Sequence, residues 1–384
     1  MKQGYYFQIL VLIVFCISCK DRYYPEIEDP GASYLVVEGI LNAGSSTTTL
    51  LLSRTRPVNS SSGSGPELNA SVAVEGSDNS LTPLTMSTPG NYQNTLALSS
   101  NNRYRVRIRT ADGKEYLSDF VSVKMTPEID SIGWKQNEKG VQLYVNTHDA
   151  TNSTVYYRWD FDETWEIHSY YQSALIFDPE SPEADMAGVR RRVFPQEDIF
   201  YCWKYGRSNN IYIGNSAKLT SDVIFQQPLN LIPSGDDRLS VKYSILLRQY
   251  AMDKAAYEFY DLMKKNTESI GDVFGPLPSE LRGNIHCTSD PKEPVIGYIS
   301  ATAPVEKRVF INRPASWPAT QFCETQFVPG NMDSTVAAFQ SGTNIPIDYT
   351  KREIPPAEGY LSSSAGCVDC TKRGGKVEKP SYWP

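Results

Sequence analysis

Apolar and polar residues alternate along several short stretches of the chain. In "RYRVRIR" at 103–109, every second residue is apolar and the others are arginines. Successive residues of a strand point to opposite faces, so this pattern predicts a strand with one buried face. Asp112-Gly113, which follows, is a dipeptide typical of a tight hairpin turn. Residues 103–123 are therefore predicted to form a β-hairpin.

Further strands are predicted at 33–41, 47–54 and 70–76, with Gly- and Ser-rich turns between them. Short strands at regular spacing are typical of a β-sandwich. We therefore expect an N-terminal β-sandwich over residues 33–125. The arginine face of its hairpin is interpreted as a solvated surface balanced by local acids. Binding of an acidic partner is the alternative.

A second β-rich domain is expected over residues 126–345, after an inter-domain joint at "TPEIDSIGW" (126–134). The stretches "VQLYVNT" (141–147) and "VYYRWDFDETWEI" (155–167) show the same two-residue period. The predicted fold class is therefore mainly β, with two β-sandwich-like (Ig-like) domains, the second carrying one inserted α-helix, after a lipoprotein signal.

One segment of the second domain has a helical period instead. Ala256, Phe259, Tyr260 and Met263 recur at the spacing of one helix face. Asp253 precedes them as a candidate N-cap. A helix near 253–266 is therefore predicted, with its apolar face packed on the second sheet.

The N-terminus carries the pattern of a secretory signal. An apolar run, "ILVLIVFCI" (9–17), is too short to span a membrane and fits a signal-peptide core. Ser18 follows as the small residue at a cleavage site. Cleavage after it would make Cys19 the first mature residue, which resembles a bacterial lipoprotein signal. An ordinary secretory signal with a chance cysteine is the alternative.

The predicted signal peptide thus covers residues 1–18, and a lipidated tether covers residues 19–32. Cys19 would carry diacylglycerol and further acyl chains, which together anchor a protein stably in a membrane. Lys20 and Asp21 directly after it are similar to the export signals of surface-exposed Bacteroidota lipoproteins. The expected localisation is the outer membrane, lipid-anchored and exposed at the cell surface.

Composition narrows the possible partners. The chain of 384 residues has a formal net charge of −7. The basic footprint of a nucleic-acid-binding protein is missing, so nucleic acid is not an expected partner. With 24 tyrosines, 25 glycines and 25 prolines, the composition suits strands and turns better than a helical bundle.

Two C-x-x-C pairs raise the possibility of a zinc ribbon, but the first pair is expected to be lost. Cys16 leaves with the signal and Cys19 is lipidated. The envelope favours disulfides, and the candidate disulfide cysteines are Cys287, Cys323, Cys367 and Cys370. A Cys367–Cys370 bridge, a Cys287–Cys323 bridge and bridges from Cys323 to the last pair all remain open. No metal site is expected.

Residues 346–384 are predicted to be a C-terminal tail containing the second C-x-x-C pair. The tail is polar, but it ends in the aromatic sequence "SYWP". Tyr382 and Trp383 carry large apolar areas, which a fully solvated tail would expose. The tail is therefore expected to dock on the second domain.

Several ordered motifs resemble one known family. They are "YLVVEGILN", "TPEIDSI", "YYRWDFDETWEI", "NTESIGDVFGPLPSELRGNI", "VIGYISA" and "CVDCTKRGGKVEKPSYWP". In this order they resemble the Bacteroidota lipoprotein family catalogued as domain of unknown function 4249. The resemblance covers nearly the whole mature chain. It implies an envelope lipoprotein, often encoded beside a TonB-dependent outer-membrane transporter, and it supplies no catalytic residues.

Catalytic motifs are absent from the sequence. It contains no G-x-S-x-G, H-E-x-x-H, P-loop or dinucleotide fingerprint, and His148, His168 and His286 are scattered. The strand 159–166 holds Asp160, Asp162, Glu163 and Glu166 among Trp159 and Trp165. This cluster allows a glycosidase-like pair or a calcium site, but alternating acids and aromatics also describe any half-buried strand.

The sequence therefore predicts a protein that is not an enzyme and needs no cofactor. The leading hypothesis is an accessory or binding subunit of a TonB-dependent transporter barrel, held at the outer membrane through its lipid anchor. A stand-alone carbohydrate- or peptide-binding lipoprotein is the first alternative. A hydrolase using the acidic-aromatic strand 159–166 is the second.

Overall fold

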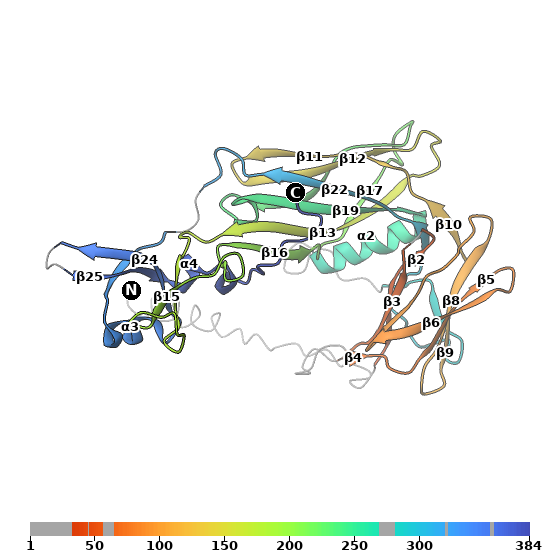
Figure 1. Ribbon diagram of the computed structural model, residues 1–384. Coiled ribbons are helices and arrows are strands. Elements are labelled where there is room, and N and C mark those ends of the chain that lie inside the picture. The colour runs from red at the N-terminus through yellow and green to blue at the C-terminus, as the bar shows by residue number, and fades with distance from the viewer. Residues whose placement is uncertain (1–32, 45, 57–64, 269–280, 319–321, 354–356) are drawn as a thin grey trace, which may run out of the picture.

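The structure is a computed structural model. It describes residues 33–44, 46–56, 65–268, 281–318, 322–353 and 357–384. The expected signal (1–18), tether (19–32) and lipidated Cys19 lie outside the described residues. The described chain is mainly β, which confirms the predicted fold class. Figure 1 shows a central sandwich with an N-terminal β-structure on one side and a smaller C-terminal module on the other.

The N-terminal β-structure is one curled sheet of twelve strands. These are β1 (Leu35–Gly39), β2 (Leu41–Asn42), β3 (Thr48–Arg54), β4 (Gly65–Pro66), β5 (Ser71–Gly76), β6 (Leu81–Thr88), β7 (Asn91–Asn94), β8 (Arg103–Arg109), β9 (Glu115–Ser118), β10 (Val121–Met125), β20 (Ile285–Cys287) and β21 (Ala301–Ala303). Consecutive strands β1 and β2 stand at opposite ends of the main strand order, so the sheet curls almost into a barrel.

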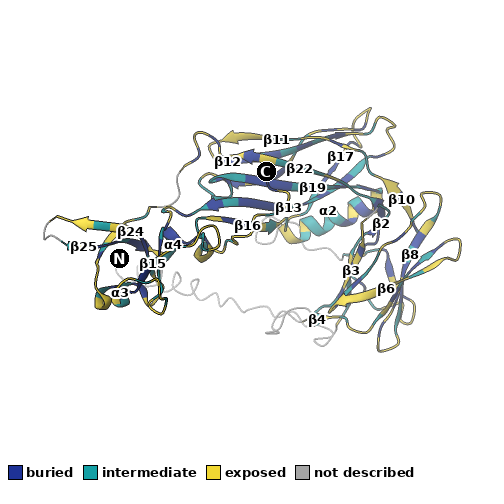
Figure 2. Cartoon of the chain, viewed as in Figure 1, coloured by how far each residue is buried: buried dark blue, intermediate teal, exposed yellow. Residues whose placement is uncertain are grey.

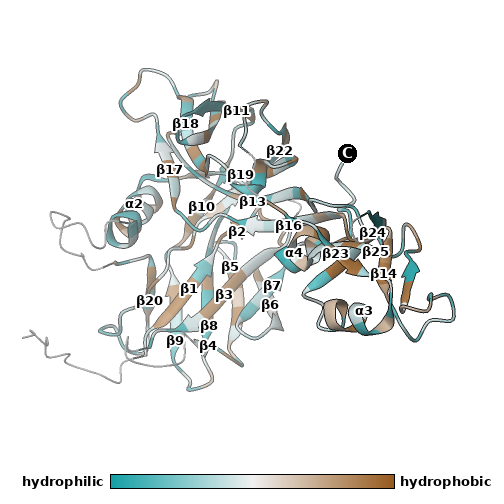
Figure 3. Cartoon of the chain, turned by 90° about the vertical axis from the view of Figure 1, so that its left-hand side faces the viewer, coloured by the Kyte–Doolittle hydropathy of each residue, from teal (hydrophilic) through white to brown (hydrophobic). Residues whose placement is uncertain are grey.

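The alternation in 103–109 sorts its residues as predicted. Val106 and Ile108 are buried in the N-terminal core, and the apolar stripes of β1, β3 and β8 appear in brown in Figure 3. On the other face, the Glu75 carboxylate forms ion pairs with the guanidinium groups of Arg105 at 2.7 Å and Arg107 at 3.0 Å. This pairing agrees with the interpretation of the arginines as a solvated face balanced by local acids.

Two strands from the range predicted for the second domain belong to the N-terminal sheet instead. β20 pairs antiparallel with β9, and β21 pairs in parallel with β10 and β2. The segment 281–303, called here the returning segment, is therefore part of the N-terminal β-structure although it is distant in sequence. Strands this short, paired with partners more than 150 residues away, leave no local pattern in the sequence.

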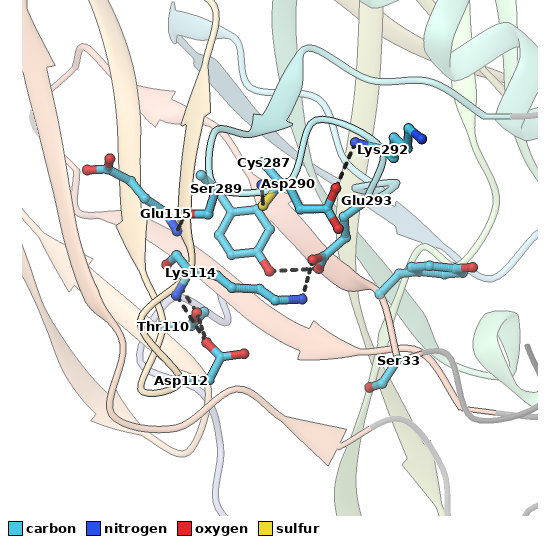
Figure 4. A network of polar contacts seen from close by, with 12 residues as sticks. Ser33, Thr110, Asp112, Lys114, Glu115, Cys287, Ser289, Asp290, Lys292 and Glu293 are labelled. Atoms are coloured by element: carbon cyan, nitrogen blue, oxygen red, sulfur yellow. Dashed lines mark hydrogen bonds and ion pairs between the residues drawn. The ribbon is translucent and has the colours of Figure 1, made fainter.

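A buried carboxylate holds the returning segment in place. The Glu293 carboxylate accepts a hydrogen bond from the hydroxyl of Tyr116 at 2.7 Å. It also forms an ion pair with the ammonium of Lys114, and Figure 4 labels both Glu293 and Lys114. Arg54 lies 3.6 Å from the same carboxylate. Charge-assisted contacts of this kind are about twice as strong as neutral ones, so they fix the segment against β9.

The central sandwich packs two sheets face to face. The larger sheet contains β13 (Tyr156–His168), β16 (Tyr201–Arg207), β17 (Tyr212–Asn215), β19 (Lys242–Met252) and β22 (Val305–Asn312), and the smaller contains β11 (Ile129–Asn137), β12 (Gly140–His148) and β18 (Val223–Pro233). The core between the two sheets contains Trp159 and Phe161 of β13 and Tyr243 of β19. Figure 2 shows the dark, buried positions along β13 and β19.

The predicted helix is α2 (Lys254–Glu268). The Asp253 carboxylate accepts the backbone N–H of Ala256 at 2.7 Å, so the predicted N-cap is confirmed. Ala256 and Phe259 are buried on the expected face. Figure 1 shows α2 between the larger central sheet and the N-terminal strands.

The C-terminal module combines two distant stretches of the chain. It contains β14 (Leu175–Phe177), β15 (Val189–Arg191), β23 (Gln326–Pro329), α3 (Met332–Phe339), β24 (Asn344–Arg352) and β25 (Ala357–Ser364). A small core of its own includes Val189, Phe339 and Tyr360. Much of the stretch predicted to be a polar tail is therefore a regular hairpin.

Two disulfides tie the C-terminal part of the chain to the rest. After β25, the short helices α4 (Ala365–Val368) and η2 (Cys370–Arg373) place the two cysteines of the C-x-x-C pair in different cores. Cys367 bonds to Cys323, and Cys370 bonds to Cys202 of β16. The bridge from Cys323 to the last pair was one of the open possibilities.

The other candidate bridges are wrong. Cys367 and Cys370 do not bridge each other, and Cys287 is a free, buried thiol. The reason is that β20 buries Cys287 in the N-terminal core, whereas Cys323 lies beside the C-terminal module. Cys202, which was not among the four candidates, is the partner of Cys370 instead.

The last residues dock on the outer face of the larger central sheet, as their aromatic content predicts. Trp383 is 5% exposed, contacts the ring of Phe310, and donates its indole N–H to Glu166 at 3.0 Å. The hydroxyl of Tyr382 is hydrogen-bonded to that of Thr164 at 2.8 Å. Within the described ranges, no helix has the length and apolar content needed to cross a membrane.

Candidate functional site

Charged side chains line the outer face of β13, opposite the buried Trp159 and Phe161. Arg158, Asp160 and Asp162 occupy alternate positions there, so all three project from the same face. The neighbouring strands place Arg248 opposite Asp160 and Arg207 opposite Asp162. The strand pairing thus assembles five charged groups from three strands into one row, called here the charged row.

Within the charged row, cations and anions alternate. Arg248 contacts Asp160 at 2.5 Å and Asp162 at 2.6 Å. Arg158 lies 3.5 Å from Asp160, and Arg207 lies 3.0 Å from Asp162. Three arginines therefore share two aspartates, which leaves the row with a net charge of +1.

These contacts set the protonation of the charged row. Burial alone would raise the pKa of Asp162, but hydrogen bonds from Arg248 and Arg207 bring it below its usual value. Burial would lower the pKa of Arg248, and its two aspartate partners raise it instead. Both groups are therefore charged at neutral pH.

Arg158 is held between two aromatic rings. Its guanidinium carbon lies 4.7 Å from the ring centre of Tyr260 on α2 and 5.3 Å from that of Tyr250 on β19. One guanidinium N–H also reaches the hydroxyl oxygen of Tyr260 at 3.2 Å. Cation–π contacts on this group fix its orientation and leave its N–H edge for in-plane hydrogen bonds.

The charged row borders a cleft of about 980 Å³ between the N-terminal β-structure and the larger central sheet. Val36 to Ile40 and Thr49 line it from the N-terminal side, and Phe259 and Met263 of α2 line it from another. A cavity of this size, lined by both polar and apolar side chains, is large enough for a small molecule or a short oligomer.

The returning segment 281–303 lines the cleft with residues 296–298. Its Gly297 has φ +143°, and a Cβ there would lie 2.1 Å from the carbonyl oxygen of Val37. Only glycine permits this close approach to β1. The next residue, Tyr298, packs against Phe259 and lies within 3.3 Å of the Asp253 carboxylate, so it joins the N-terminal β-structure to α2.

The acidic residues of the strand 159–166 do not form a catalytic pair. Glu163 points into the sandwich, where it accepts hydrogen bonds from Tyr243 at 2.6 Å and Asn230 at 2.9 Å. Glu166 contacts His168 at 2.7 Å and Trp383 at 3.0 Å. Asp160 and Asp162 share Arg248. Each of these carboxylates is therefore engaged by a cation or a hydrogen-bond donor, and they do not form the facing pair that a glycosidase needs.

The histidines and Cys287 are also kept apart. His286 and Cys287 are neighbours on β20, so His286 is exposed while Cys287 is buried. His148 lies 2.8 Å from Asp130 at the surface. In the described part of the chain, no three His, Cys, Asp or Glu side chains gather in a way that would hold a metal ion.

Most of the cleft was missed by sequence reasoning. The strand 159–166 was singled out for its acids, but Arg158 was not. Arg207, Arg248 and the two tyrosines come from other strands and from α2. The available signal was the polar character of alternate positions on β19, in "KYSILLRQY" (242–250), once that strand is paired with β13.

The fold and the cleft define a mainly β protein with a preformed interdomain cleft. Residues 20–308 match the model of the family described as "Domain of unknown function (DUF4249)". The chain belongs to this family, which confirms the family predicted from its sequence motifs; the last of these motifs, at 367–384, lies beyond the matched range.

Other comparisons give weak similarities. No curated protein sequence shows a significant match. A Bacteroides uniformis protein described provisionally as carbohydrate-binding is 12% identical, with 59% of this chain and 92% of that chain covered and a TM-score of 0.15. Chitinase ChiA74 from Bacillus thuringiensis is 11% identical, with 54% and 29% covered and a TM-score of 0.16. Similarities at these TM-scores support no conclusion about fold or ligand.

Proposed function

We propose that this protein is a ligand-binding lipoprotein of the outer membrane, exposed at the cell surface, that serves a TonB-dependent transporter and catalyses no reaction. The observation that carries the binding role is the cleft beside the charged row. Arg158, which lies over two tyrosine rings, lines the cleft, and its nearest carboxylate, Asp160, is already paired with Arg248. Such a site can recognise a ligand through a guanidinium held in a fixed orientation.

The placement at the membrane rests on the sequence around Cys19 and on what the family resemblance implies. A stand-alone binding lipoprotein has the same cleft but no transporter partner. Solubilising native membranes in mild detergent and capturing the tagged protein separates the two. A stoichiometric transporter barrel in the captured fraction supports the first, and capture without a barrel supports the second.

Replacing Cys19 with alanine is expected to abolish labelling with palmitate and to release the protein from the membrane fraction, because the lipid anchor is attached there. Cys16→Ala is the matched control, since Cys16 lies in the segment removed with the signal and its loss should leave labelling unchanged. Full labelling and sedimentation of the Cys19 variant would contradict the anchor.

Thr49→Trp is expected to weaken ligand binding by about tenfold or more, because Thr49 is an exposed cleft residue and an indole there fills part of the cavity. The full-length protein in detergent is screened by thermal shift against pools of neutral oligosaccharides, acidic oligosaccharides and short peptides. Ser122→Trp, at an exposed position of β10 outside the cleft lining, is the control. No binding from any pool, or binding that Thr49→Trp leaves intact, contradicts the proposal.

A further inference from the structure

We propose that the ligand of the cleft is an acidic saccharide with a single uronic-acid carboxylate among neutral sugar units, and that Arg158 binds this carboxylate. The inference rests on the proposed binding function and names the ligand class of the same site. It follows from the ion pairing of Arg158, from the charges at the cleft mouth, and from the polar groups of the lining.

Arg158 is the arginine of the charged row with the weakest carboxylate contact. It lies 3.5 Å from Asp160, whose other oxygen is 2.5 Å from Arg248. Its side chain is only 23% exposed, so it is largely removed from water. A desolvated guanidinium whose nearest carboxylate is shared and distant gains most from an anion supplied by a ligand.

The stacking of Arg158 defines the form of that anion. Tyr250 and Tyr260 lie against the guanidinium, and its N–H groups that are not bonded to Tyr260 or Asp160 remain for a ligand. A planar carboxylate matches a guanidinium edge with two parallel hydrogen bonds. The geometry also fixes the guanidinium before binding, which lowers the entropy cost of forming both bonds.

Other charges at the cleft limit the total charge of the ligand. Glu38 on β1 and Glu306 on β22 also line the cavity, and both are exposed. They would repel additional carboxylates, although solvent and salt weaken this effect at exposed positions. The cleft therefore suits a ligand with one carboxylate better than a polyanion.

The remaining lining favours sugar over peptide. Side-chain amides and hydroxyls suited to sugar hydroxyl groups come from Asn42, Ser46, Thr47, Thr49, Ser208, Asn209 and Asn210. The edge of β1 beside the cleft is already paired: Val37 donates its N–H to Ile296 at 2.8 Å, and Ile296 donates to Leu35 at 3.0 Å. A peptide cannot add a strand at an edge whose main-chain groups are in use.

Calorimetric titration of the full-length protein in detergent tests this inference. The probes are a xylo-oligosaccharide bearing one glucuronic acid, the neutral xylo-oligosaccharide of the same length, and a short peptide with a free C-terminal carboxylate. The wild type is expected to bind the acidic probe about tenfold more tightly than the neutral one. Arg158→Gln should remove this difference in affinity between the two probes.

Two further variants make the result specific. Arg158→Lys keeps the charge but cannot form the paired bonds, so about half of the discrimination in free energy is expected to be lost. Arg105→Gln is the matched control, because Arg105 is also stacked on a ring, Phe120 at 4.6 Å, and paired with an acid, but lies outside the cleft lining. It should bind all probes as the wild type does.

The outcomes separate the ligand class from the binding site. Equal affinity for the acidic and neutral probes, unchanged in Arg158→Gln, overturns the acidic class but leaves the cleft as the site. Tighter binding of the peptide, lost in Arg158→Gln, overturns the saccharide. Acidic-probe binding that persists in Thr49→Trp overturns the cleft itself, and with it the proposed function.

Discussion

Replacing Cys202 and Cys370 together with serine is expected to lower the free energy of unfolding by about 3–5 kcal/mol. The bridge joins residues 168 apart in sequence, and the chain-entropy treatment gives about 5 kcal/mol for a loop of this size. Both cysteines are buried in the central core, so two hydroxyls there add a further cost. Urea unfolding of the wild type and the variant measures the difference.

Reduction distinguishes the lost bridge from the effect of the serines. Dithiothreitol should destabilise the wild type strongly, and the double variant less, because it keeps only the Cys323–Cys367 bridge. Cys287→Ala, which removes a free thiol and no cross-link, should leave the response to dithiothreitol unchanged. A double variant as stable as the wild type would contradict the role of the bridge in holding the C-terminal segment on β16.

Arg248→Met is expected to lower the free energy of unfolding by about 2–4 kcal/mol near pH 7. Arg248 contacts both Asp160 and Asp162, whereas Arg158 and Arg207 contact one each. Its removal leaves two part-buried carboxylates with weaker partners, and losing one member of a buried ion pair is strongly destabilising. Thermal or urea unfolding measures the change.

The loss in Arg248→Met should depend on pH. Although burial opposes it, hydrogen bonds from Arg248 and Arg207 hold the folded pKa of Asp162 below its usual value of 3.8. A carboxyl with a lowered folded pKa stabilises the protein above the usual value, and this stabilisation is lost as pH falls through the folded pKa. The deficit should be largest above about pH 5 and shrink towards about pH 3.

Arg207→Met is the control for this prediction. Arg207 contacts the same Asp162, but its side chain is 77% exposed. Exposed ion pairs contribute about 1 kcal/mol or less, so this variant should unfold almost as the wild type does. Similar losses in both variants would show that the charged row is not held by Arg248.

Elements with a strong local period were predictable from the sequence. The hairpin around Asp112-Gly113 and the helix α2 with its Asp253 cap depend on side chains a few residues apart. β20 and β21 were not predictable, because they are three residues long and their partners are distant. The same reason explains why Cys287 was wrongly included among the disulfide candidates and Cys202 was not.

The candidate site shows the same limit. The sequence drew attention to the acids of the strand 159–166, because they stand together in the chain. Their roles depend on partners from other strands: Arg248 pairs with Asp160, and Tyr243 binds Glu163. Arg158, which the proposed ligand contacts, owes its environment to Tyr250 and Tyr260 from two later elements.

Hydrogen–deuterium exchange of the full-length protein, alone and with each of the three probe pools, tests the cleft most directly. If the cleft is the ligand site, the pool that contains a ligand should slow amide exchange at residues 208–211 and 296–298, which line the cleft. Exchange in β24 and β25 of the C-terminal module should not change. Protection confined to that module, or no protection at the cleft with any pool, would contradict the account.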